Sequence, residues 1–130
     1  DFQQLKVIER MVRDLSLPVK VIGAPIARDD DGLALSSRNQ YLSAQERARA
    51  PLIHDTLLKM RELLHQGHPW RAVEQVAEAQ LSRAGFVPDY AAIRRAGDLA
   101  EPDDGQRDGL VALIAARLGG TRLIDNLLLD

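Results

Sequence analysis

The chain has 130 residues, of which 45% are hydrophobic and 28% are charged, a balance typical of a folded globular protein. Its formal net charge of −2 provides no overall field for holding a nucleic-acid backbone or an anionic membrane. The absence of cysteine excludes disulfides, thiolate metal sites and cysteine nucleophiles. The apolar runs are too short to span a bilayer, so we expect a soluble, cytoplasmic protein.

The first segment predicts an amphipathic helix and then a short strand. Apolar residues recur at three- and four-residue spacing, at Leu5, Ile8, Val12 and Leu15. Pro18 prevents the helix from continuing, and residues 19–23 favour a short buried strand. Because one strand cannot form a sheet alone, this segment is interpreted as the end of a larger α/β domain.

A long loop is predicted over residues 24–41, where no hydrophobic period holds. Loops of this length often carry function. The loop ends in Ser36, Ser37 and Arg38, whose two hydroxyls and guanidinium can together donate several hydrogen bonds to a polyanion. The alternative is a turn in which the serines cap backbone amides and the arginine is solvated. The acidic run 29–31 is interpreted as solvated rather than as a magnesium site.

Helices are predicted after the loop. Ser43 and Glu46 have the spacing of a capping box, and Pro51 either kinks this helix or starts a second one. The apolar face of the following helix comprises Ile53, Leu57, Met60 and Leu64, and Gly67 ends that helix. The next helix carries Trp70, Val73, Val76, Ala77 and Leu81, and Gly85 ends it.

The last third of the chain predicts strands at 88–95, 110–118 and 121–129. Gly119 and Gly120 lie between the last two strands and indicate a hairpin with a type I′ turn, in which both central residues have positive φ. The predicted fold is therefore an α/β fragment followed by a small α+β domain with helices and a three-stranded antiparallel sheet.

The remaining polar candidates are sparse. Asp1 and Gln4 lie one helical turn apart, where side chains can face a ligand in a crevice beside a sheet, or can be a helix cap and an exposed amide. His54, His65 and His68 do not form a ligand set, so we predict no metal site built from protein side chains. There is no Ser–His–Asp order, glycine-rich phosphate loop or dinucleotide fingerprint.

Several blocks, in order along nearly the whole chain, match one enzyme family. They are Asp-Phe-Gln-Gln-Leu at 1–5, Gly-Ala-Pro-Ile at 23–26, Asp-Gly-Leu-Ala-Leu-Ser-Ser-Arg-Asn-Gln-Tyr-Leu at 31–42, Ala-Arg-Leu-Gly at 116–119 and Thr-Arg-Leu-Ile-Asp-Asn at 121–126. With these blocks the chain resembles the C-terminal portion of the pantothenate synthetase (pantoate–β-alanine ligase) family.

The resemblance implies a ligase that condenses pantoate with β-alanine through a pantoyl-adenylate intermediate, using ATP and Mg²⁺ and releasing pyrophosphate and AMP. It also implies a homodimer, and membership of the nucleotidyltransferase superfamily of class I aminoacyl-tRNA synthetases. Residues 1–30 would then be the end of a Rossmann-like nucleotide-binding domain, residues 31–42 an ATP-binding loop and hinge, and residues 43–130 the C-terminal α+β domain.

The implied catalytic residues are Ser36, Ser37 and Arg38, which would hold the ATP triphosphate. Leu35 would add a backbone contact to ATP. In this family the Ser-Ser-Arg block is the counterpart of the lysine-rich mobile loop of the synthetases, so its implied task is to stabilise the leaving pyrophosphate.

Three further contacts are implied by the resemblance. Asp1 would meet the ATP ribose, the backbone of Ala27 would meet adenine, and Gln4 would hydrogen-bond pantoate. The family's N-terminal portion, with a His-x-Gly-His block and further pantoate-binding residues, does not precede Asp1 in this sequence. We therefore expect the 130-residue chain to be inactive alone.

Two other functions are compatible with the residues. One is a non-catalytic α+β module that binds a nucleotide or a protein partner. The other is a nucleic-acid binder that uses Arg47, Arg49 and Arg61, an idea that the overall acidity weakens. We expect small-molecule substrates, and neither nucleic-acid nor membrane partners.

Overall fold

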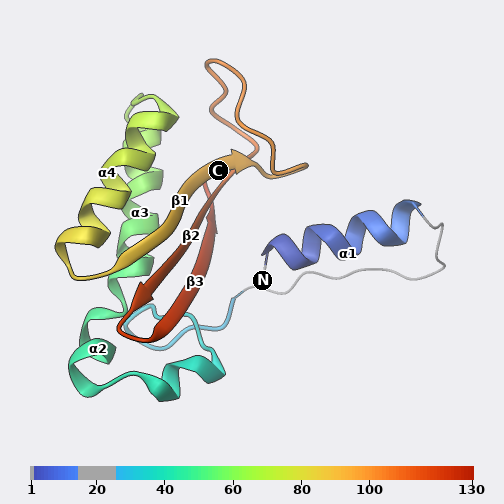
Figure 1. The fold of residues 1–130 in the computed structure, drawn as a ribbon. Coiled ribbons are helices and arrows are strands. Elements are labelled where there is room, and N and C mark those ends of the chain that lie inside the picture. The colour runs from blue at the N-terminus through green and yellow to red at the C-terminus, as the bar shows by residue number, and fades with distance from the viewer. Residues whose placement is uncertain (1, 15–25) are drawn as a thin grey trace.

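A computed structural model describes residues 2–14 and 26–130. In these residues the elements follow one another as α1 (Phe2–Asp14), η1 (Ser37–Tyr41, a 3-10 helix), α2 (Ala44–Arg49), α3 (Leu52–His65), α4 (Trp70–Arg83), β1 (Val87–Arg95), β2 (Leu110–Leu118) and β3 (Thr121–Leu128) (Figure 1). The predicted helices and the last three predicted strands are confirmed. Asp1 and the strand predicted at 19–23 lie outside the described residues.

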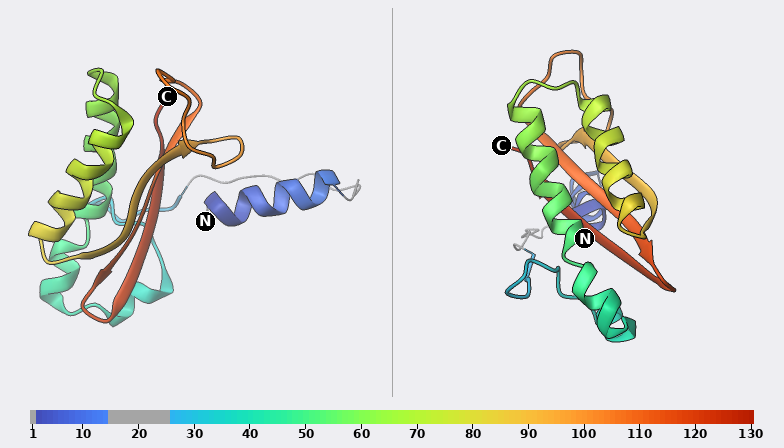
Figure 2. Two further views of the ribbon diagram at one scale, coloured as in Figure 1. Left: turned by 45° about the horizontal axis from the view of Figure 1, so that its top comes forward. Right: turned by 90° about the vertical axis from the view of Figure 1, so that its left-hand side faces the viewer.

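The three strands form one antiparallel sheet in the order β1-β2-β3. Helices α3 and α4 cover one face of this sheet, and α1 lies on the side of the other face (Figures 1 and 2). The predicted α+β arrangement is therefore confirmed, with β3 at a free edge of the sheet among the described residues. No helix in this part of the chain is both long and apolar enough to cross a bilayer.

The core lies between the sheet and the two long helices. The predicted apolar face of α3 is buried, and β2 is buried along nearly its whole length because it is the central strand. The fully buried side chains include Leu57, Met60, Leu64, Leu81, Ile93, Leu110 and Ile114. Each such side chain contributes roughly 1.5–3 kcal/mol through burial, so this core fixes the position of the sheet that carries the site.

The helix boundaries follow the predicted signals. The Ser43 hydroxyl accepts from the Glu46 amide at 3.1 Å, and Glu46 Oε1 accepts from the Ser43 amide at 2.8 Å, which completes the capping box. Pro51 stands at the start of α3 with φ −60°, so the second of the two alternatives for this proline is confirmed.

The hairpin between β2 and β3 is confirmed, but its predicted turn type is wrong. Leu118 pairs with Thr121 across the two glycines, yet only Gly119 has a positive φ, of 61°. Positive φ at the first central residue alone is the pattern of a type II′ turn. A physical reason for glycine at this position is its neighbour, since a Cβ on Gly119 would overlap the Glu46 carboxylate of α2.

The segment 26–42 contains short structure that its sequence did not predict. Arg28 and Ala34 form an antiparallel bridge, and the Asp29 amide donates to the Leu33 carbonyl at 2.9 Å. This narrow loop turns at Gly32, whose φ is 93°. The segment then runs into η1, which lies against β3 (Figure 1). The division of the chain at 30 and 42 stays a prediction.

Candidate functional site

Two adjoining clefts lie where the segment 26–39 meets the free edge of the sheet. The first cleft has a volume of about 300 Å³ and is lined by η1, by the residues before it and by β3. The second cleft, of about 320 Å³, extends toward Gln3 of α1 and Tyr90 of β1. Both are lined by Ala34, Ser36, Arg122, Ile124 and Asp125. The shared lining makes the two clefts one continuous candidate site.

The predicted catalytic residues line the first cleft together. Ser36 is the N-cap of η1 and its hydroxyl accepts from the Arg38 amide at 3.2 Å, which fixes the turn. Ser36, Ser37 and Arg38 are all exposed. Among the described residues, the Arg38 guanidinium has no hydrogen-bond or ion-pair partner. Two hydroxyls and an unneutralised guanidinium therefore line the same space of the first cleft.

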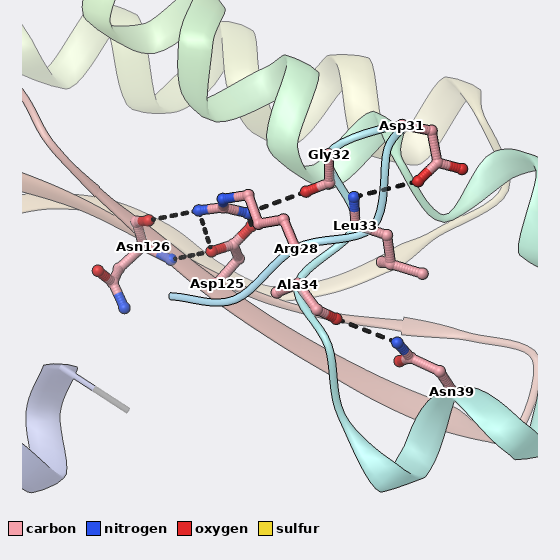
Figure 3. A network of polar contacts seen from close by, with 8 residues as sticks. All are labelled: Arg28, Asp31, Gly32, Leu33, Ala34, Asn39, Asp125 and Asn126. Atoms are coloured by element: carbon pink, nitrogen blue, oxygen red, sulfur yellow. Dashed lines mark hydrogen bonds and ion pairs between the residues drawn. The ribbon is translucent and has the colours of Figure 1, made fainter. Parts of the chain in front are cut away.

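Asn39 ties this turn to the strand-like residues before it. Its side-chain Nδ2 donates to the carbonyl of Ala34 at 3.0 Å (Figure 3). Its Oδ1 is buried and has no partner within the described residues. Asn39 thus holds η1 next to residue 34, a role that nothing in the residue's own sequence context had indicated.

A charged pair attaches the segment to β3. Arg28 donates to both carboxylate oxygens of Asp125, at 2.6 and 2.9 Å, and also to the carbonyls of Gly32 and Asn126 (Figure 3). The Asp125 side chain is 3% exposed and that of Arg28 is 20% exposed. A bidentate pair of this kind is directional as well as strong, so it fixes the register of the segment against the strand.

Ala27 and Leu35 lie next to each other because of this arrangement. The Leu35 amide donates to the Ala27 carbonyl at 2.9 Å, beside the bridge between residues 28 and 34. Two backbone positions that the resemblance implies for ATP are therefore adjacent, although they are eight positions apart in the sequence.

The comparisons with known proteins agree along the whole chain. A sequence model described as Pantoate-beta-alanine ligase matches residues 1–128. The chain belongs to the pantoate–β-alanine ligase family. A pantothenate synthetase of Stenotrophomonas maltophilia is 58% identical over 128 residues, and one of Xanthomonas oryzae pv. oryzae is 55% identical over 127 residues. Each match covers 98% of this chain and 45% of the relative, so the chain spans about half the length of the curated relatives it matches.

Solved structures of the same family share the fold. The crystal structure of pantothenate synthetase from Thermus thermophilus has a TM-score of 0.90 and 44% identity, covering 99% of this chain and 47% of that one. A pantoate–β-alanine ligase from Francisella tularensis, described as complexed with beta-gamma ATP and beta-alanine, has a TM-score of 0.65 and 25% identity. That match covers 99% of this chain and 41% of the other. The fold class is thereby confirmed as part of a pantoate–β-alanine ligase.

The remaining family-implied residues are distributed less tightly. Gln4 is exposed on α1, while its neighbour Gln3 lines the second cleft. Asp1 lies outside the described residues. The structure therefore brings the predicted residues 35–38 and Ala27 together at one edge, and the roles of Asp1 and Gln4 stay predictions.

Two of the three carboxylates in the acidic run beside the site are paired with one arginine. Arg47 of α2 donates to Asp31 at 2.7 Å and to Asp29 at 2.8 Å. Hydrogen bonding from Arg47 lowers the pKa of the Asp31 carboxyl, so this carboxylate stays ionised and paired. In the described part of the chain, no group of three or more His, Asp or Glu side chains is placed to hold a metal ion.

Residues 65–68, His-Gln-Gly-His, have the His-x-Gly-His spacing that the resemblance assigns to the family's N-terminal portion. The structure places these residues at the C-terminal end of α3, whereas the cleft residue Ile53 is near its start, roughly 18 Å away along the helix axis. His65 Nε2 lies 2.6 Å from the carbonyl oxygen of Leu129, and Arg107 donates to the carbonyls of Gly67 and His68. This tetrapeptide ends a helix and does not belong to the site.

Proposed function

We propose that this chain supplies the side of a pantothenate synthetase site that binds the phosphates of ATP. The observation that carries the proposal is the first cleft, in which Ser36, Ser37 and Arg38 lie together while the Arg38 guanidinium has no partner among the described residues. Hydroxyls donate to phosphate oxygens, and a guanidinium matches their charge and geometry. Family membership supports ATP as the phosphate compound.

The proposed reaction begins with attack of a pantoate carboxylate oxygen on the α-phosphorus of ATP. The bond between the α-phosphorus and its bridging oxygen breaks, so pyrophosphate leaves and pantoyl-adenylate forms. The amine of β-alanine then attacks the acyl carbon, loses a proton and displaces AMP, which yields pantothenate. Because two anions must approach in the first step, positioning and charge stabilisation supply most of the catalysis. Arg38 offsets the charge that develops on the leaving pyrophosphate.

The family resemblance supports the other proposed contacts, of which Leu35 lines the second cleft. The backbones of Leu35 and Ala27 would bind ATP, the latter at adenine, while Asp1 would bind the ribose and Gln4 pantoate. For Mg²⁺, three nearby carboxylates, those of Asp29, Asp31 and Asp125, are paired with arginines. We therefore propose phosphate oxygens and water, rather than carboxylates of the described residues, as its ligands.

Among the described residues, the contacts of Arg47 and Arg49 on α2 do not favour nucleic-acid binding. Arg47 is paired with two aspartates, and Arg49 donates to the Ala84 carbonyl at 3.2 Å. These contacts direct both guanidiniums into the molecule's own fold. The homodimer and the cytoplasmic location stay predictions from the sequence.

The proposal is tested with a hybrid enzyme, in which this chain replaces the matching segment of the 58% identical Stenotrophomonas maltophilia relative. We expect the hybrid enzyme to form pantothenate from pantoate, β-alanine and ATP. The 130-residue chain alone, purified free of host enzyme, should form none, since it spans 45% of that relative. A hybrid that folds but forms no pantothenate would contradict the proposed function. Turnover by the 130-residue chain alone would contradict the proposal that this chain supplies only one side of the site.

A further inference from the structure

Arg122, the second residue of β3, lines both clefts. It therefore borders the same space as Ser36 while lying on a different element, 84 residues beyond Arg38 in the sequence. We propose that Arg122 is a second phosphate-binding arginine, which grips the polyphosphate chain of ATP from β3 while Arg38 grips it from η1. The inference rests on the proposed function and adds a residue to that site.

The position of Arg122 is fixed by an irregularity two strands away. In the pairing of β1 with β2, Pro88 pairs with Ala116 and Tyr90 with Ala115, which leaves Asp89 as the extra residue of a β-bulge. A bulge redirects the side chain of its extra residue. The Asp89 carboxylate reaches Arg122 on β3, where Oδ2 accepts from Nε at 2.8 Å. The bulge thus supplies an acceptor that orients the guanidinium.

This contact orients Arg122 and leaves its outer nitrogens without a counter-charge. Asp89 accepts from the inner nitrogen, Nε, and within the described residues no carboxylate is bonded to either Nη atom of Arg122. The two Nη groups are the part of the guanidinium best suited to a bidentate contact with phosphate. The Tyr90 side chain, which lines the second cleft, also interacts with Arg122, but as a neutral phenol it does not balance the charge of the guanidinium.

The local charge balance favours an anion. Asp89 lies between two arginines, with Arg117 Nε 3.9 Å from its other oxygen, so this group of three carries a formal net charge of +1. Asp125, the one carboxylate that lines both clefts, is neutralised by Arg28. Arg38 and Arg122 are thus the two cationic side chains that line the first cleft among the described residues.

The volume of the first cleft is compatible with a bound chain of a few phosphate groups. A volume of about 300 Å³ is at the small end of ligand sites, and the first cleft is lined by both hydroxyls and both arginines. A polyanion of a few phosphate groups that entered this cleft would meet Arg38 and Arg122 together. Tripolyphosphate is therefore the appropriate probe, because it presents the charge of the ATP phosphates without the nucleoside.

The experiment titrates tripolyphosphate into the 130-residue chain at low salt and follows the amide resonances of residues 36–38. Circular dichroism establishes that each variant is folded. We expect Arg122→Gln and Arg38→Gln each to weaken binding about tenfold, which is the value of one lost charge-assisted hydrogen bond. Arg122→Lys should bind with intermediate affinity. The matched control is Arg71→Gln, which removes an exposed arginine of α4 remote from the clefts and should change affinity less than twofold.

A second variant separates binding from strand pairing. Asp89→Asn keeps the charge of Arg122, weakens its orienting bond and removes a negative charge that opposes anion binding. We expect a severalfold loss of tripolyphosphate affinity in folded protein, because the lost orientation outweighs the removed charge. If Arg122 only joined strands, Asp89→Asn and Arg122→Gln would lower stability, and Asp89→Asn would not lower affinity. If Arg122→Gln does not fold, Arg122→Lys and Asp89→Asn decide the question by the same criterion.

The outcomes distinguish the two proposals. Loss of affinity in Arg38→Gln but not in the Arg122 and Asp89 variants would overturn this inference and leave the proposed function intact. Failure of the folded wild-type chain to bind tripolyphosphate, or indifference of binding to Arg38→Gln, would overturn the proposed phosphate site itself.

Discussion

Asp125 and Arg28 are the residues that determine most directly where the segment 26–39 lies. They are 97 positions apart in the chain, and their bidentate contact is the strongest polar link between the segment and β3. The carboxylate is almost completely removed from water, so its desolvation is offset only while the arginine is present. The pair is thus a positioning element for Ala27 and for the turn at residues 36–38.

We expect Asp125→Asn to lower the free energy of unfolding by about 3 kcal/mol, because it leaves a largely buried guanidinium without its counter-charge. Urea unfolding of the chain measures this value. The matched control is Glu101→Gln, which breaks an exposed pair with Arg71 at 3.5 Å and should cost less than about 1 kcal/mol. Equal, small effects of the two substitutions would contradict the assignment of Asp125 as the anchor.

His54, in the same region, makes the stability of the fold depend on pH. It lies under Gly32, where a Cβ would come within 2.6 Å of its ring, and its Nδ1 is buried without a partner in the described structure. Burial, reinforced by the positive charge of Arg28, lowers the pKa of His54 below the ordinary value of 6.5. The folded state therefore keeps the imidazole neutral at a pH where the unfolded chain already binds a proton.

The sign of the effect follows from that difference in proton binding. Stability from this group is fully present above about pH 6.5 and is lost as the pH falls through 6.5 toward the lowered pKa. We expect the unfolding free energy to decrease between pH 7 and pH 5, and His54→Gln to flatten this slope. His68→Gln, at an exposed position, is the control and should retain the slope. An unchanged slope in His54→Gln would show that the histidine is not responsible.

At the scale of elements, local sequence signals predicted the helices and strands well. Apolar spacing indicated α3 and α4, and two glycines indicated the hairpin, because these signals depend on neighbours close in the sequence. The bulge at Asp89 and the Arg28–Asp125 pair could not be predicted in this way. Each depends on strand register or on a contact between distant residues, which no local pattern encodes.

The candidate site shows the same limit. The Ser-Ser-Arg turn was identified from its residue types, but Arg122 borders the same cleft only because β3 and η1 lie side by side. Similarly, the sequence predicted that the acidic run at 29–31 is solvated, whereas in the structure two of its carboxylates are paired with Arg47 of α2.

The hairpin provides a matched pair of substitutions at this scale. Gly119→Ala must place a Cβ against the Glu46 carboxylate and keep a positive φ, so we expect a loss of about 1–2 kcal/mol in unfolding free energy. Gly120→Ala meets no atom within 4 Å and has no positive φ, so its effect should be within about 0.5 kcal/mol. Thermal unfolding of both variants measures the difference, and equal losses would contradict the geometry of the turn.

At the scale of the whole molecule, the two clefts lie along β3, the first reaching Ile53 of α3 and the second reaching Gln3 of α1. Helix α1 lies on the side of the sheet opposite α3 and α4 (Figure 2). The helix on that side, α1, exposes apolar side chains, with Val7 68% and Met11 47% accessible. Helices gain most of their stability from packing of such a face. In the isolated chain, α1 is therefore less stabilised than the core that α3, α4 and the sheet form.

We accordingly expect backbone amides of α1 to exchange with solvent faster than those of β2, whose side chains are almost all buried. Hydrogen exchange followed by NMR, at a concentration where the chain is monomeric, gives both rates in one experiment. Equal protection of α1 and β2 would contradict this difference in stability.

The central claim, that the Ser-Ser-Arg turn binds the phosphates of ATP during adenylation, is tested most directly by measuring the two half-reactions of the hybrid enzyme with Arg38→Lys. Lysine keeps the charge but loses the bidentate geometry, at a cost of roughly 1.5–3 kcal/mol, so pantoyl-adenylate formation should slow by about one to two orders of magnitude. Attack of β-alanine on preformed pantoyl-adenylate should change much less, because pyrophosphate has already left. Adenylation within about twofold of the unsubstituted hybrid enzyme would contradict the claim and remove Arg38 from the site.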